Sequence, residues 1–295
     1  MHTATYYIDL LLSGITVGSL YALIAIGYTM VYGILRLINF AHGDIFMMSG
    51  FFMIYVSATL PMAVSIPVVL LMTVLLGVLI ERAAYKPLRS APRMSVMISA
   101  IGVSYLLQNV ALLIWGADTK SFSNVISLPS LKLAGGSIVI TGVTIVTIIG
   151  GILIMAGLML FISKTKTGQA MLAVSEDKGA AQLMGINVNK TISVTFAIGS
   201  GLAAIAGVLL CSAYPSLTPY TGAMPGIKAF VAAVFGGIGS IPGAFIGGIV
   251  LGILEIFGKA YISSQMADAI VFGVLIVVLV VKPTGILGKN IQEKV

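Results

Sequence analysis

The residues able to do catalytic or metal chemistry are few and scattered. His2 and His42 are the only histidines, and Cys211 is the only cysteine. No acidic or cysteine cluster surrounds either histidine at the spacing of a metal site, so His42 is expected to have a structural role. Cys211 can form no internal disulfide, and its apolar neighbours are typical of packing. These patterns predict no enzyme, no metal site and no cofactor.

Two glycine-rich stretches are similar to nucleotide-binding loops but lack their required residues. A dinucleotide fingerprint counted from Gly237 would need glycine where Pro242 stands. Between Gly252 and Gly258 five residues intervene instead of the four of a P-loop, and Ala260 stands where serine or threonine is needed. The chain is therefore not expected to bind and hydrolyse ATP by that route.

The composition indicates that most of the chain lies in lipid. Hydrophobic residues make up 59% of the 295 residues and charged residues 8%, against about 25% in a soluble domain. The net charge of +7 comes from Lys and Arg dispersed along short loops, without interleaved aromatic residues, so nucleic-acid binding is not expected. We predict one membrane domain over residues 1–295, because the apolar runs leave no room for a sizeable soluble domain.

Apolar runs between charges and Gly or Pro breaks predict an all-α polytopic transmembrane bundle of about nine spans. The predicted helices cover residues 8–31, 43–60, 63–81, 95–115, 141–162, 191–211, 226–238, 243–258 and 267–281. The run 226–238 is short for a span. If 226–258 forms a re-entrant hairpin, the count becomes seven.

Charge placement predicts the orientation. With the N-terminus outside and the C-terminus inside, twelve of the 16 Lys and Arg residues fall in inner turns. Only Lys120, Lys132, Lys228 and Lys259 fall outside. Because short inner loops are enriched in Lys and Arg, N-out and C-in is the predicted topology.

The nine acidic residues are expected near the ends of spans rather than at the membrane midplane. Asp44 and Glu81 are placed near inner ends, and Glu255 and Asp268 near outer ends. Ion-coupled carriers usually hold ionisable groups near the midplane, so this placement argues against a secondary transporter.

Small residues recur at four-residue spacing in several predicted helices and let helix backbones approach closely. Such rows can pack helices within one subunit or face a partner subunit, and the sequence leaves both open. The rows are Gly14 and Gly18; Gly199, Ala203 and Gly207; and Gly243, Gly247 and, after a one-residue shift at Gly248, Gly252.

Four stretches together closely resemble the H-type permeases (LivH) of high-affinity branched-chain amino-acid ABC importers. They are GSLYALIAIGYTMVYGILRLINFAHGD (18–44), SEDKGAAQLMGIN (175–187), KAFVAAVFGGIGSIPGAFIGGIVLGILE (228–255) and KPTGILG (282–288). The resemblance implies a multi-pass permease of the bacterial inner (plasma) membrane, surrounded by membrane lipid. It also implies three kinds of partner: an M-type permease, two cytoplasmic ATPase subunits that supply the energy, and a periplasmic substrate-binding protein.

The implied cargo is leucine, isoleucine and valine, although similar permeases carry other amino acids, short amides or urea. The alternative from another functional class is a self-contained channel. It fits the lack of midplane carboxylates but gives no reason for the long inner loop between Ile162 and Thr191.

A path for a zwitterion is expected to offer modest dipoles rather than a tight charged site, because strong binding would slow release. The candidates are Tyr28, Asn39, Gln108 and Asn109, with Tyr21 as a further candidate. The alternative for each is a hydrogen bond between helices.

The inner loop 163–190 resembles the family's coupling segment, which transmits ATPase movement to the membrane helices. Ser175 is the predicted N-cap of a short helix, with Glu176 and Asp177 in its first turn and Gly185 at its end. Leu183 and Met184, adjoining Ala180, are predicted to form an apolar face for the ATPase. Lys178 and Gly179 separate the acids from Ala180 and Ala181, which departs from the consensus of many other ABC importers.

The outer segments 116–140 and 212–227 are the only predicted outward loops long enough to receive the binding protein. Tyr214, Pro215 and Tyr220 are the predicted rim contacts, with simple loop packing as the alternative.

Overall fold

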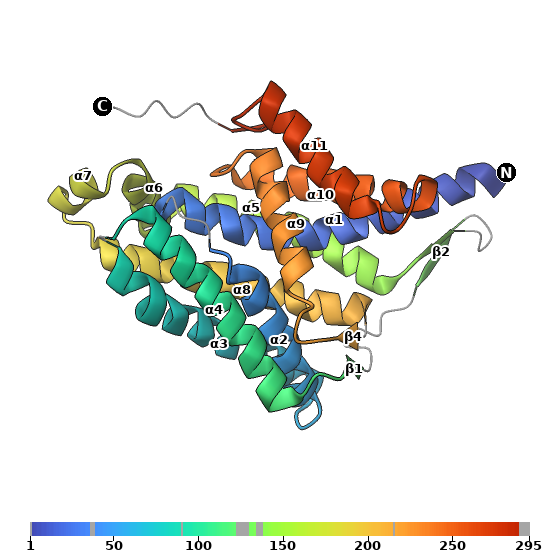
Figure 1. Ribbon diagram of the computed structural model, residues 1–295, viewed down its shortest axis with the longest axis horizontal. Coiled ribbons are helices and arrows are strands. Elements are labelled where there is room, and N and C mark those ends of the chain that lie inside the picture. Colours follow the sequence, from blue (N-terminus) through green and yellow to red (C-terminus); the bar gives the residue numbers. More distant parts are fainter. Residues whose placement is uncertain are drawn as a thin grey trace. The chain divides into compact units, whose positions relative to one another are not determined.

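A computed structural model describes residues 2–35, 39–89, 91–121, 130–133, 138–214 and 216–288. In these ranges the chain is mostly helical, which confirms the predicted all-α class (Figure 1). The α-helices are α1 (His2–Leu35), α2 (His42–Ser57), α3 (Met62–Ile80), α4 (Arg93–Trp115), α5 (Gly142–Lys164), α6 (Lys166–Glu176), α7 (Lys178–Leu183), α8 (Val188–Ala213), α9 (Ala223–Gly236), α10 (Ile241–Tyr261) and α11 (Ala267–Val281).

Short irregular helices and strands complete the described chain. After α3 come a π-helical turn, η1 (Glu81–Tyr85), and a 3-10 turn, η2 (Lys86–Leu88). Strand β1 (Lys120–Ser121) pairs antiparallel with β4 (Ser216–Leu217), and β2 (Leu131–Leu133) pairs with β3 (Ile138–Ile140).

All nine predicted apolar runs are helical, but only six described helices have the length and composition of a complete membrane span. These six are Thr5–Leu35, Met62–Leu88, Met94–Trp115, Gly142–Lys164, Val188–Ala213 and Ile241–Tyr261. Helices α2, α9 and α11 have 16, 14 and 15 residues. At about 1.5 Å per residue they are shorter than the roughly 30 Å hydrocarbon core.

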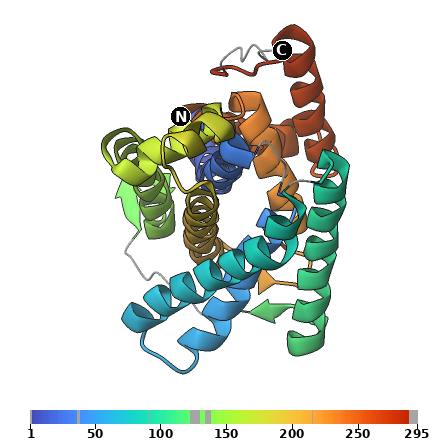
Figure 2. The ribbon, with the colours of Figure 1, turned by 90° about the vertical axis from the view of Figure 1, so that its left-hand side faces the viewer.

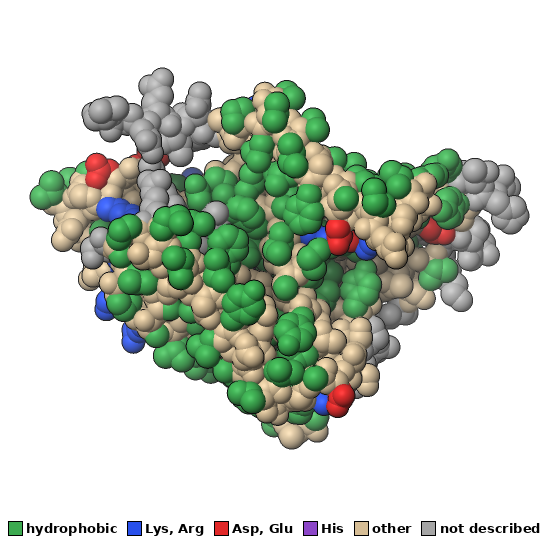
Figure 3. Space-filling model, in the orientation of Figure 1, with side chains coloured by type: hydrophobic (Ala, Val, Ile, Leu, Met, Phe, Trp, Pro, Cys, Tyr) green, Lys and Arg blue, Asp and Glu red, His purple; other side chains and the backbone are tan. Residues whose placement is uncertain are grey.

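The described surface is rich in hydrophobic side chains. They cover much of the face in Figure 3, where charged side chains are few. Leu113 and Val280 are 84% and 79% exposed. Since soluble proteins rarely expose large contiguous apolar areas, this surface is suited to lipid.

The described chain packs as two compact units. The central unit comprises residues 30–125 and 156–227. Its most closely packed helices are α2, α3 and α8, which lie side by side in Figures 1 and 2. A Cβ at Gly77 would lie 2.5 Å from the Cβ of Ser200, and a Cβ at Gly207 would lie 2.8 Å from the carbonyl oxygen of Phe46. The small residues of α8 therefore pack within this subunit.

The terminal unit comprises residues 1–29, 126–155 and 228–295. Here α1 and α10 approach closely, since a Cβ at Gly18 would lie 2.7 Å from the Cα of Ile249. The turn between α9 and α10 contains Gly237 and Gly239 at φ of 107° and 92°, a region that favours glycine.

The segment after α11 pairs with the end of α9 in the same unit. The backbone N–H groups of Ile286 and Leu287 donate to the carbonyl oxygens of Phe235 and Gly236, each at 2.9 Å. Two of the four stretches that carry the family resemblance are thus in direct contact.

Candidate functional site

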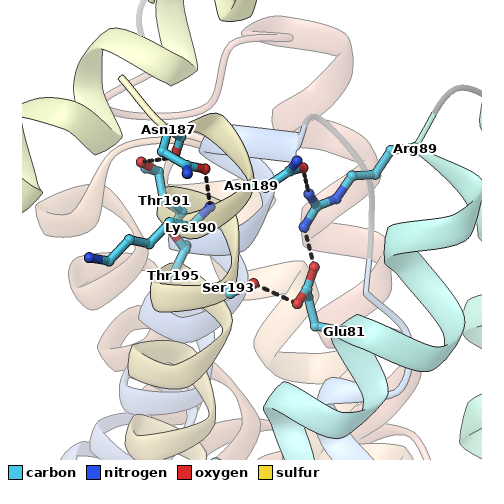
Figure 4. Close-up of polar contacts among 8 residues, drawn as sticks. All are labelled: Glu81, Arg89, Asn187, Asn189, Lys190, Thr191, Ser193 and Thr195. Atoms are coloured by element: carbon cyan, nitrogen blue, oxygen red, sulfur yellow. Dashed lines mark hydrogen bonds and ion pairs between the residues drawn. The ribbon is translucent and has the colours of Figure 1, made fainter. Parts of the chain in front are cut away.

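Glu81 is a fully buried carboxylate where α3 passes into the π-helical turn η1. The hydroxyl of Ser193 on α8 donates to Glu81 Oε2 at 2.8 Å, and Arg89 forms an ion pair with Oε1 (Figure 4). Arg89 also donates to Asn189 in the first turn of α8. A buried carboxylate is stable only where partners compensate for its lost hydration. This network, the Glu81–Arg89 clamp, ties the end of α3 to the start of α8.

The short helix predicted in the inner loop begins later than expected. Ser175 and Glu176 belong to the last turn of α6. Asp177 is the N-cap of α7, and its Oδ1 accepts from the backbone N–H groups of Gly179 and Ala180 at 2.7 and 2.9 Å. The predicted N-cap role of Ser175 is therefore wrong, because α6 continues through that residue.

The predicted end of this helix is confirmed. Gly185 has a φ of 80°, the left-handed conformation expected of it. The N–H of Ile186 donates to the carbonyl of Ala181, and the N–H of Gly185 donates to that of Gln182, each at 3.0 Å. These two bonds form the Schellman motif that ends many helices.

The end of α7 exposes large apolar side chains. Leu183 and Met184 are 90% and 82% exposed. Ala180 is also exposed and shares their face of the helix, whereas Ala181 is buried against the protein. Exposed apolar side chains on a helix outside the long spans are typical of a protein contact.

A cavity of about 530 Å³ lies beside α7 in the central unit. Its lining comes from α7, the loop between α7 and α8, the start of α8, the end of α1, the start of α4, and the η1–η2 segment with Arg89 after it. The lining residues are Leu35, Tyr85, Arg89, Val96, Lys178, Gln182, Gly185, Ile186, Asn187, Val188, Asn189 and Ile192.

Gln108, one of the predicted path residues, contacts a carboxylate that was not among the predicted path residues. Its Nε2 donates to Asp44 Oδ1 at 3.0 Å, and the hydroxyl of Ser104 donates to Asp44 Oδ2. Asp44 is 2% exposed in the first turn of α2. Asp44 thus lies near the start of its helix, as expected, while its partner Ser104 lies midway along α4.

The other predicted path residues of the central unit have different hydrogen-bond partners. Asn39 accepts a hydrogen bond from the hydroxyl of Tyr85 at 2.5 Å. Asn109 is exposed and its side chain donates to the carbonyl of Tyr105, four residues earlier in its own helix, at 2.8 Å. Asn109 is thus satisfied locally.

Tyr21 and Tyr28 belong to the terminal unit. The hydroxyl of Tyr21 donates to Glu255 Oε2 at 2.8 Å, and the ring of Tyr28 packs edge-to-face on Phe230 with centroids 6.0 Å apart. Lys228, 5% exposed, also lies 2.9 Å from Glu255 Oε1.

Further ion pairs join this buried pair to its neighbours. Lys228 lies 2.6 Å from Asp268 Oδ1, and Lys259 lies 2.5 Å from Glu255 Oε1. The ion pairs connect α9, α10 and α11. One feature of the sequence could have predicted these ion pairs. Lys228 and Glu255 lie inside apolar runs, where charges are costly and usually paired.

Two of the three predicted docking residues are exposed. Tyr214 and Tyr220 are 47% and 57% exposed, whereas Pro215 lies outside the described residues. Strand pairing places Lys120 opposite Leu217, so parts of the segments 116–140 and 212–227 lie side by side.

The long apolar helices, with polar groups buried between them, define a multi-pass helical membrane protein with the features of a transport protein. The profile of the family described as branched-chain amino acid transport system / permease component matches residues 10–280. The chain belongs to this family.

Named relatives align over nearly the whole chain. The chain is 45% identical to the high-affinity branched-chain amino acid transport system permease protein BraD of Pseudomonas aeruginosa, with 98% of each chain covered. It is 44% identical to the permease protein LivH of Escherichia coli K12, again over 98% of each. A probable LivH of Methanocaldococcus jannaschii is 31% identical, over 92% of this chain and 89% of the relative. No solved structure matches the chain.

Proposed function

We propose that this chain is the membrane permease subunit of an ABC importer for the branched-chain amino acids leucine, isoleucine and valine. The observation that carries the proposal is 44–45% identity over 98% of the chain to permeases named for high-affinity branched-chain amino acid transport. The family profile over residues 10–280 supports the same function.

Residues 1–295 act as one permease domain in the bacterial inner membrane, with the N-terminus outside and the C-terminus inside. The distribution of Lys and Arg supports this orientation. The three short helices α2, α9 and α11 complete a nine-span arrangement together with the six long ones. Thiol labelling of Leu183→Cys from the cytoplasm and of Tyr220→Cys from the periplasm is the expected pattern, and the reverse would refute the orientation.

Energy comes from two cytoplasmic ATPase subunits that bind the coupling loop 163–190 at the exposed end of α7. The exposed Leu183 and Met184 at the end of α7 support this role, since they form an apolar contact of the kind a groove accepts. Movement of α7 would reach the membrane helices through Gly185, the start of α8 and the Glu81–Arg89 clamp.

The candidate path residues remain Tyr21, Tyr28, Asn39, Gln108 and Asn109. We add Asp44, because Gln108 and Ser104, the latter midway along α4, hold its carboxylate, which attracts the ammonium group of a zwitterion. A second permease of the M type completes the path, and a loaded periplasmic binding protein docks on Tyr214, Pro215 and Tyr220.

Uptake of labelled amino acids by cells tests the cargo. A strain without its own branched-chain amino-acid uptake should regain leucine uptake when it expresses this permease with its partner subunits. Unlabelled isoleucine and valine should compete, while urea and acetamide should not. Competition by urea or acetamide alone would show that the cargo has been misassigned.

A further inference from the structure

The cavity beside α7 combines an apolar floor with a polar rim. The buried floor side chains Leu35, Tyr85, Val96 and Ile192 are at most 7% exposed. The rim side chains Lys178, Gln182, Asn187 and Asn189 are exposed. A volume of about 530 Å³ lies within the range of small-molecule sites. The ligand that matches has a short apolar body and one polar end.

The charge of the cavity lining determines which polar group a ligand can carry. Arg89 and Lys178 are cations, and among the described residues the lining contains no carboxylate. Glu81 neutralises part of the Arg89 charge from outside the cavity, and the Nε of Arg89 remains buried without a hydrogen-bond partner in the described part of the chain. An anion would gain from this rim, whereas an ammonium group would meet two cations and no carboxylate in the lining.

We propose that this cavity binds a branched aliphatic monocarboxylate anion from the cytoplasm and that the bound anion restrains the coupling helix. The proposal rests on the proposed function, because it assigns α7 to ATPase coupling. The apolar body would fill the floor, and the carboxylate would lie at the rim near Arg89 and Lys178. The 2-oxo acid left when leucine loses its amino group has this chemistry and the size of the cargo.

Regulation follows from the position of the cavity. Lys178 and Gln182 belong to α7, whereas Arg89 belongs to the Glu81–Arg89 clamp. A ligand that contacts both would resist movement of α7 relative to α3 and α8. Accumulation of a product made from the cargo would then slow further import.

Equilibrium binding to the purified importer complex tests the site. The complex, in nanodiscs of zwitterionic lipid, is dialysed against labelled 4-methyl-2-oxopentanoate. Leucine and 4-methylpentanamide serve as competitors of similar size without net negative charge. The 2-oxo acid should bind, and both competitors should bind at least about tenfold more weakly.

Substitutions at two exposed glutamines give a matched set. Gln182→Glu places a negative charge on the rim and should weaken binding about tenfold, whereas Gln182→Lys should not weaken it. Gln169→Glu makes the same chemical change on α6, outside the cavity lining, and should leave binding unaltered. Inhibition of ATP hydrolysis by the 2-oxo acid should shift in parallel with binding.

Several outcomes would overturn the inference. They are no binding of the 2-oxo acid, equal binding of leucine or the amide, equal weakening by Gln169→Glu, and displacement by phosphatidylglycerol, which would assign the cavity to a lipid headgroup. Import of leucine by the same complex separates the two ideas. If the complex imports leucine with ATP but does not bind the 2-oxo acid, only the regulatory site is refuted. If the complex imports no leucine, the proposed function is refuted.

Discussion

At the scale of single residues, the buried polar contacts are where sequence and structure differ most. Gln108 could be chosen from the sequence because an amide in an apolar run is conspicuous. Its partner Asp44 lies 64 positions away, and the sequence placed that carboxylate near the end of a span. The depth of Asp44 depends on how α2 packs against α4, which no local pattern contains.

The contact between Asp44 and Gln108 predicts non-additive mutations. Gln108→Leu removes a donor from a buried carboxylate and should destabilise the protein by about 1–3 kcal/mol, with a several-fold loss of leucine uptake. Asp44→Asn in the Gln108→Leu background should cost less than the two single changes combined. Thermal unfolding of the unsubstituted protein, the two single variants and the double variant measures this coupling. Additive effects of the two substitutions would rule out the contact.

The Glu81–Arg89 clamp predicts a larger effect. Arg89→Met leaves the buried Glu81 carboxylate without its cation and should destabilise the protein by about 3–5 kcal/mol. Adding Glu81→Gln should recover much of that loss, because no buried charge then lacks a partner. Arg82→Gln, on an exposed side chain next to Glu81, should change stability by less than about 0.5 kcal/mol. Unfolding in detergent compares the variants, and equal stability of Arg89→Met and Arg82→Gln would contradict the clamp.

At the scale of elements, helix ends were predictable where one residue type decides them. Gly185 was predicted because a left-handed residue at a helix end is usually glycine. The start of α7 was missed because Ser175 and Asp177 are both good N-caps. The choice depends on α6, whose buried Met171 and Val174 pack as a helix that continues through Ser175. That packing is not visible in the polar sequence of the loop.

Gly185 predicts a conformational requirement in the coupling loop. Gly185→Val should cost about 1–2 kcal/mol, because a β-branched residue is strained at a φ of 80°. It should also reduce coupled transport by misplacing α7. Gly157→Ala is the control, since Gly157 lies within α5 and an added Cβ there meets nothing within 4 Å. If Gly185→Val is as stable and active as Gly157→Ala, the left-handed turn has no role.

The exposed end of α7 predicts where the ATPase binds. Leu183→Asp with Met184→Asp should reduce association with the ATPase subunits about tenfold or more, because an apolar contact would have to bury two charges. The same change at Leu172, a half-exposed apolar residue of α6, should leave association unchanged. Co-purification at equal permease levels in the membrane measures the difference. Normal association of the Leu183 and Met184 variant would remove this face from the interface.

At the scale of the whole molecule, the apolar runs sufficed to predict the helical class and a helix at each of the nine runs, and six of the described helices have the length and composition of a complete span. They showed that the run 226–238 is short for a span, but not that α2 and α11 are short as well, because the point where a helix ends in the membrane depends on packing. The buried ion pair of Lys228 and Glu255 was missed because the sequence analysis placed both residues at the outer side of the membrane, whereas each lies more than one turn inside its helix.

The central claim is that this chain moves branched-chain amino acids only when partner ATPases hydrolyse ATP. Proteoliposomes containing the permease pair, the ATPases and the loaded binding protein test it through labelled leucine transport. We predict transport with ATP, and loss of transport when the catalytic P-loop lysine of the ATPases is replaced. Leucine flux that continues undiminished with the inactive ATPases would contradict the importer and identify the chain as a self-contained channel.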